Sequence, residues 1–165
     1  MTLTKYEFKT LFDQHFDAIR NYIYYRSGDS DLATDLAQDV FLRLWEKQPD
    51  FHPKATVGLL YKMAGDEFIS QYRRQKLELN YKNSLAFSME ENVSPEEELE
   101  YKELQQRYEK ALAGLPEKQR VVFLMSRMDG LKYHEIADRL SISVKAVEKR
   151  MKSALDDLKS KFKEK

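Results

Sequence analysis

A chain of 165 residues has room for one mid-sized domain or two small ones. Charged residues make up 34% of the chain and glycine occurs only five times, a balance typical of helical proteins with solvated faces. The absence of cysteine excludes disulfides and thiolate zinc sites. No segment is apolar for long enough to cross a membrane, and the N-terminus lacks the apolar core of a signal peptide. We therefore expect a cytoplasmic protein without direct membrane insertion.

The formal net charge of zero conceals an uneven distribution. Residues 80–110 carry 4 basic and 8 acidic side chains, whereas residues 111–165 carry 13 basic and 8 acidic ones. The resulting charge of +5 in the last third favours a nucleic-acid partner for that part of the chain. Because +5 is modest, neutralisation of phosphates alone predicts weak binding, and a second binding element or a carrier partner is expected.

Three helices are predicted for the first half of the chain. The first keeps its apolar period to about residue 25, where Ser27-Gly28-Asp29 ends it, and the second covers about 30–47. The prolines within 48–55 indicate a loop, and a third helix is expected over about 56–79. Its inward side chains are expected to be Val57, Leu60, Tyr61, Ala64, Phe68 and Tyr72.

Residues 80–95 have weak periodicity and are interpreted as a linker, the alternative being an ordered loop packed across one domain. Ser94 is the expected cap of the next helix. About four helices are predicted for the second half, with Gly114 and Gly130 as helix ends and Pro116 as a helix start. Strand signals are almost absent. The predicted fold class is all-α, with two small helical domains joined by a linker and a helix-turn-helix in the C-terminal one.

The helix-turn-helix is predicted over residues 133–159, with its turn at Ser141-Ile142-Ser143. The expected inward side chains are Ile136, Ala137 and Leu140 in the first helix and Val147, Met151, Leu155 and Leu158 in the second. Cationic side chains remain on the outer surface of the second helix, where such motifs contact phosphates and base edges. Three-helix cores with no role in DNA binding produce the same pattern, so the motif by itself leaves both interpretations open.

Three segments in this order resemble one known family: residues 27–47 (SGDSDLATDLAQDVFLRLWEK), 60–76 (LYKMAGDEFISQYRRQK) and 115–151 (LPEKQRVVFLMSRMDGLKYHEIADRLSISVKAVEKRM). Over about residues 8–162, the chain resembles the extracytoplasmic-function (ECF) subfamily of sigma-70-type sigma factors. The resemblance implies a bacterial transcription initiation factor, not an enzyme. Such a factor binds core RNA polymerase, through the β′ coiled coil and the β subunit, and directs it to promoter DNA.

The resemblance also divides the chain. It implies a domain similar to sigma region 2 over 1–79, for polymerase binding and for recognition and melting of the −10 element. A linker over 80–95 and a domain similar to sigma region 4 over 96–165, for the −35 element, complete the chain. No cofactor is expected. An anti-sigma factor, often membrane-bound in the family, is an expected partner.

The second predicted helix matches the polymerase-binding segment of the family. The matching residues are Asp35, Gln38, Asp39, Leu42, Arg43 and Trp45. The first four fall at three- and four-residue spacings and therefore share one helix face. Carboxylates beside an aromatic edge suit a partner helix rich in arginine. The alternative is a solvated helix face, with Trp45 in the core of the domain.

The loop and the third helix match the segments that capture the melted −10 strand. The candidates are Phe51, His52, Lys54, Lys62, Asp66, Arg73 and Arg74. Aromatic contact and hydrogen bonds hold an unstacked base in such a site. The chain departs from the family at Gly65-Asp66, where an Arg-Asn or Lys-Asn pair is usual, so the role of Asp66 and the −10 preference stay open. Arg73 and Arg74 also suit a plain helix C-terminus, which favours cations.

The second helix of the predicted motif matches the −35 recognition helix. The candidates are Ser143, Val144, Lys145, Glu148, Lys149, Arg150 and Lys152. The lysines would reach phosphates or guanine, Glu148 would accept from a cytosine amino group, and Arg150 would contact the DNA backbone. Ser141 replaces a glycine that is common in the turn, a change that is tolerable at negative φ. The alternative is a helix that lysines merely keep soluble.

Two other functions stay open from the sequence: a stand-alone helix-turn-helix regulator that binds operator DNA without polymerase, and a scaffold with the sigma fold that binds only a regulator. The three histidines lack the spacing of a metal site, and no phosphate-binding loop or nucleophile motif is present. The sigma-factor interpretation further predicts that the free protein hides its DNA surfaces, by packing its domains together or against an inhibitor.

Overall fold

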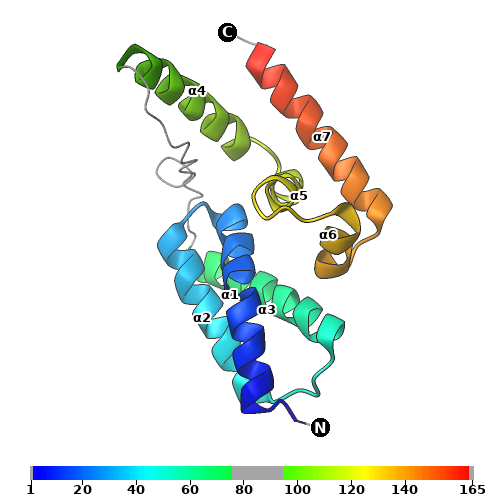
Figure 1. The fold of residues 1–165 in the computed structure, drawn as a ribbon. Coiled ribbons are helices and arrows are strands. Elements are labelled where there is room, and N and C mark those ends of the chain that lie inside the picture. Colours follow the sequence, from blue (N-terminus) through cyan, green and yellow to red (C-terminus); the bar gives the residue numbers. More distant parts are fainter. Residues whose placement is uncertain (1, 76–94, 164–165) are drawn as a thin grey trace.

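The computed structural model describes residues 2–75 and 95–163. Within these ranges the regular secondary structure is entirely helical, which confirms the predicted fold class (Figure 1). The helices are α1 (Lys5–Ser27), α2 (Ser30–Lys47), α3 (Pro53–Gln75), α4 (Pro95–Ala113), α5 (Glu117–Arg127), α6 (Tyr133–Leu140) and α7 (Val144–Lys163). The predicted linker up to residue 94 and the predicted cap Ser94 lie outside the described residues.

The first domain is a bundle of α1, α2 and α3, each of which packs on the other two. Its helix ends follow local chemistry. Thr4 and Glu7 form a capping box at the start of α1, and Gly28 ends α1 in the left-handed conformation at φ 71°. The side chain of Asp29 then caps α2 by accepting from the backbone N–H of Leu32. Aromatic rings of α1 and α2 pack on each other in this bundle, and the ring centroids of Phe8 and Trp45 lie 5.2 Å apart.

The second domain consists of α4 to α7, with α5 at its centre. Helix α7 packs on α4, α5 and α6, and in Figure 1 α4 and α7 extend to either side of α5. Its core is made of fully buried side chains, which include Leu112, Val122, Leu124, Met125 and Ile136. Gly130 follows α5 at φ 67° and carries the chain into α6, so the predicted helix stop is confirmed.

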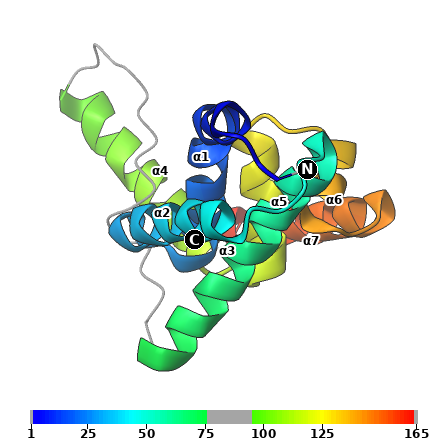
Figure 2. The same cartoon turned by 90° about the horizontal axis from the view of Figure 1, so that it is seen from below.

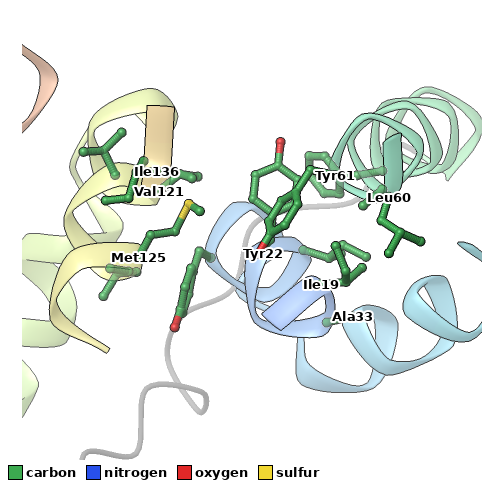
Figure 3. Close-up of a cluster of buried hydrophobic side chains, with 14 of the residues drawn as sticks. Ile19, Tyr22, Ala33, Leu60, Tyr61, Val121, Met125 and Ile136 are labelled. Atoms are coloured by element: carbon green, nitrogen blue, oxygen red, sulfur yellow. The ribbon is translucent and has the colours of Figure 1, made fainter. Parts of the chain in front are cut away.

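The two domains pack against each other through two helix pairs, α1 with α5 and α3 with α6 (Figures 1 and 2). Apolar side chains join across this contact. Figure 3 shows Val121 and Met125 of the second domain on the side that faces Tyr22 of the first. The apolar cores of the domains are therefore continuous, and the expected packing of one domain on the other is present.

Three details differ from the sequence-based prediction. Helix α3 begins at Pro53, because proline suits the first helical position and the side chain of Thr56 accepts from the N–H of His52. Tyr72 and Leu155 were expected to point inward and are exposed. Tyr72 lies near the end of α3, where its ring is tilted against that of Phe68 with the centroids 6.1 Å apart, and Leu155 lines a shallow pocket between α7 and Tyr133 at the start of α6.

The turn of the helix-turn-helix also differs, because Ser141 does not keep a negative φ. Ser141 ends α6 in the left-handed conformation, at φ 57° and ψ 45°, and its N–H donates to the carbonyl of Ala137. A left-handed residue is the usual way for a helix to end, and glycine is the residue that adopts it without steric cost. The serine therefore stores backbone strain at the point where the motif turns.

We expect Ser141→Gly to raise the free energy of unfolding by about 1 kcal/mol, because glycine removes the steric cost of the left-handed conformation. Urea unfolding followed by circular dichroism measures the change. Ser70→Gly, at an exposed position inside α3, is the matched control and should lower the stability by about 0.5 kcal/mol. A loss of stability in both variants would show that position 141 carries no strain.

Candidate polymerase and nucleic-acid interfaces

The outer face of α2 carries the residues predicted to bind polymerase. Asp35, Gln38 and Asp39 are exposed, and Leu42, one turn further along, is 56% exposed. Helix α2 packs on α1 and α3, on the side of the first domain away from α5 and α6. An apolar side chain on the same helix face as two carboxylates is thus presented to solvent while the domains are packed together, as expected of a protein-binding face.

Two of the predicted polymerase contacts also hold the first domain together. Arg43 of α2 forms an ion pair of 2.7 Å with Glu67 of α3, whose side chain is only 6% exposed. The arginine thereby balances a buried carboxylate, the arrangement that burial of a charge requires. Trp45 is half-buried and packs on Phe8, so it belongs partly to the core.

Three of the residues predicted to capture the −10 strand line two clefts between the domains, and all three are exposed. Lys54 lines a cleft of about 410 Å³, whose other residues include His15 of α1 and Arg139 of α6. Lys62 and Asp66 line a second cleft, of about 270 Å³, which Arg139, Leu140 and Ser141 complete from the helix-turn-helix. Helix α6 therefore lies against the face of α3 that carries the predicted DNA contacts.

The remaining −10 candidates are divided. Phe51 is half-buried and packs on the core of the first domain, whereas His52 beside it is exposed. Arg73 and Arg74 lie in the last turn of α3, and their side chains are outside the described part of the structure. Helix α6 packs on part of α3, and Lys54, Lys62 and Asp66 remain exposed beside it.

The predicted −35 residues form the exposed side of α7 near its start. Lys145, Glu148, Lys149 and Lys152 are exposed and Arg150 is half-buried. Ser143 has a structural role in addition, because its hydroxyl accepts from the N–H of Ala146 and caps the helix. The principal contacts of α7 are with α4, α5 and α6, all in the second domain. The predicted −35 residues therefore lie on a helix that makes no principal contact with the first domain.

The sequence analysis missed a set of polar contacts between the domains. Arg120 of α5 is 1% exposed; its Nε donates to the carbonyl of Tyr25 at 2.9 Å and its Nη2 to that of Arg26 at 3.2 Å. Its Nη1 donates to the carbonyl of Leu115 at 2.9 Å, within the second domain. The only signal in the sequence was a single arginine directly before the apolar run Val121 to Met125.

A second polar contact joins Asp129 to α1. Its Oδ1 accepts from the hydroxyl of Tyr25 at 2.6 Å and from the side chain of Asn21 at 3.2 Å. Burial raises the pKa of Asp129, and the hydrogen bonds from Tyr25 and Asn21 only partly offset this effect. Near the same boundary, burial and the charge of Arg139 lower the pKa of His15. Titratable groups of both domains, Asp129 and His15, are thus partly buried at the boundary between the domains.

Neither a metal site nor a membrane span emerges from the described residues. In 2–75 and 95–163, no three His, Cys, Asp or Glu side chains gather closely enough to hold a metal ion. Among the helices of the same ranges, none combines the length and the apolar character needed to cross a bilayer.

Comparison with known proteins identifies both domains. Residues 11–78 match the family model described as Sigma-70 region 2, and residues 105–158 match that described as Sigma-70, region 4. The ferric citrate uptake sigma factor FecI of Escherichia coli is 31% identical over 156 residues, which cover 94% of this chain and 90% of that protein. The ECF RNA polymerase sigma factor SigE of Mycolicibacterium smegmatis is 26% identical over 144 residues, which cover 84% of this chain and 54% of that protein.

Two solved structures share the fold. The sigma factor RpoE in complex with the anti-sigma factor NepR, from Bartonella quintana, aligns with a TM-score of 0.65 at 24% identity, over 96% of this chain and 98% of that one. CnrH in complex with the cytosolic domain of CnrY aligns with a TM-score of 0.62 at 22% identity, over 95% and 88%. The chain therefore belongs to the ECF subfamily of sigma-70 sigma factors, a non-enzymatic family, and directs RNA polymerase in the initiation of transcription.

Proposed function

We propose that the outer face of α2 is the surface through which this sigma factor binds the β′ coiled coil of core polymerase. The exposed Leu42, on the same face as Asp35, Gln38 and Asp39, is the observation that carries the assignment, because within the described residues it is 56% exposed. An exposed apolar side chain with carboxylates on the same helix face complements a partner helix that offers apolar and arginine side chains. The second domain is proposed to contact the β subunit.

We further propose that the first domain, residues 1–79, reads the −10 element through the loop before α3 and through Lys62 and Asp66. The second domain, residues 96–165, would read the −35 element through α7, with 80–95 as the linker. Support for the first assignment is the grouping of the candidates on one side of α3, and for the second the exposed cationic start of α7. The site of action would be the cytoplasm, where polymerase and promoter DNA meet.

An anti-sigma factor is the proposed regulator. Two proteins of the same fold have been solved with anti-sigma factors or their cytosolic domains, which supports this choice of partner class. The chain presents apolar side chains to solvent on both domains, such as Leu42 on α2 and Leu104 on α4, that a protein partner would cover. A membrane-bound anti-sigma factor with a cytoplasmic segment would meet the sigma factor in the proposed compartment.

We expect Asp39→Arg to weaken binding to core RNA polymerase at least tenfold, because it places a cation at the centre of an acidic face. Fluorescence anisotropy of labelled protein titrated with core polymerase measures the affinity. Asp17→Arg, which makes the same charge change at an exposed position of α1, is the control and should bind as the wild type does. Equal losses in both variants would point to a general charge effect and remove α2 as the binding face.

For the −35 assignment, we expect Lys149→Ala to weaken promoter binding by the reconstituted holoenzyme several-fold. Loss of one phosphate contact should also reduce the slope of log K against log salt by about 1. Lys159→Ala, at the other end of the same helix, should leave both quantities unchanged. An unchanged slope for Lys149→Ala on promoters with an intact −35 element would contradict the assignment of α7.

A further inference from the structure

Arg26, near the C-terminal end of α1, connects three helices from the two domains. Its Nε lies 2.5 Å from Oε1 of Glu117, the first residue of α5, and its Nη1 donates to the hydroxyl of Tyr22 at 3.2 Å. The guanidinium also lies 4.8 Å from the ring centroid of Phe68 on α3. A single side chain thus ties the −10 helix α3 and helix α1 to the second domain.

Gly65 of α3 provides the space in which the head of Arg26 lies. A Cβ built at Gly65 would be 3.1 Å from Nη1 of Arg26 and 3.4 Å from the hydroxyl oxygen of Tyr22. The close contact is specific to position 65, because a Cβ built at Gly58, on the same helix, would meet nothing within 4 Å. Glycine inside a helix costs about 1 kcal/mol relative to alanine, so the space at position 65 is obtained against helix propensity.

The same place is where the second domain meets the part of α3 that carries two predicted −10 residues. Gly65, Lys62 and Asp66 line one cleft with Arg139 and Ser141 of the helix-turn-helix. Arg139 adds a hydrogen bond of 3.1 Å from its Nη1 to the hydroxyl of Tyr61, on the turn of α3 before Gly65. Lys62 and Asp66 remain exposed at the edge of this contact.

We propose that Gly65, Arg26 and Glu117 form a latch that helps to hold the second domain against α1 and α3 of the first. The latch is a property of the free chain and does not depend on the proposed function of α3. Displacement of the Arg26 head by a side chain at position 65, or loss of the carboxylate at position 117, shifts the equilibrium toward the open form, whereas the contacts of Arg120 continue to favour the closed one. The exposed α2 face stays available in the closed form, so polymerase can bind before the latch opens.

The test measures domain opening by energy transfer between two dyes. The chain contains no cysteine, so Asp17→Cys on α1 and Ser160→Cys on α7, both exposed, give specific labelling of the full-length protein. We expect efficient transfer in the otherwise unmodified chain. Gly65→Leu and Glu117→Gln should each raise the ratio of open to closed molecules about tenfold, as expected for loss of one charge-assisted contact. Ser70→Leu, which adds the same side chain at an exposed position of α3 outside both clefts, is the matched control and should leave the ratio unchanged.

A double variant separates the latch from a general loosening. Because Gly65→Leu and Glu117→Gln both act through Arg26, their combined effect should be clearly smaller than the product of the single effects. Two results would overturn the latch: an effect of the double variant equal to the product of the single effects, or an energy-transfer efficiency in Glu117→Gln equal to that of the unmodified chain. Should Gly65→Leu fail to fold, Gly65→Ala replaces it, and Glu117→Gln, at a half-exposed position, is still expected to fold.

Binding to core polymerase, measured on the same variants, distinguishes the latch from the proposed function. Opening of Gly65→Leu with no polymerase binding by any variant would leave the latch standing and refute the α2 assignment. Polymerase binding with identical transfer in all variants would refute the latch and leave the assignment standing. We expect all variants to bind polymerase tightly. In the latch variants, the energy-transfer efficiency should fall at a lower polymerase concentration than in the unmodified chain.

Discussion

The arrangement of the two domains depends on one buried guanidinium. Arg120 of α5 lies at the end of α1, where its guanidinium donates to the carbonyls of Tyr25 and Arg26 in the last turn of that helix. A cation at that place is stabilised by hydrogen bonds and by the negative end of the helix dipole. Since Arg120 also donates to Leu115 in its own domain, its donors are satisfied only when both domains are together. A buried charge of this kind would be costly in a separated second domain.

This constraint decides where the second domain lies on the first. Pairing of α5 with α1 brings α6 onto α3, so that Lys62 and Asp66 line a cleft with the helix-turn-helix. The outer faces of α2 and α7 take no part in these helix pairs. The domains pack together as expected, but this packing does not hide the predicted DNA surfaces, because Lys54, Lys62 and Asp66 stay exposed and the start of α7 is open.

The sequence predicted what depends on local pattern and missed what depends on the contact between domains. Helix periods gave α1 and α2, and glycines marked the ends of α1, α4 and α5, because apolar spacing and left-handed caps are local properties. The positive φ of Ser141 was missed because serine gives no sign of it. Arg120 and Arg26 were missed because the partners that join the two domains lie more than 90 residues away in the chain. Gly65 was visible as a departure from the family, and its cause became clear only from the position of Arg26.

The exposed faces together imply an order of events at a promoter. With α2 as the proposed polymerase surface, binding needs no opening of the domains, and it raises the local concentration of both domains proposed to read DNA. The modest charge of +5 in residues 111–165 is then sufficient, because polymerase supplies the tether that phosphate contacts alone lack. Lys62 and Asp66 are exposed while α6 packs on α3, so the proposed −10 contacts do not need prior separation of the domains. The contacts of Arg26 and Arg120 set the free energy of separating the domains, and polymerase must supply it if the two proposed DNA surfaces are to move apart.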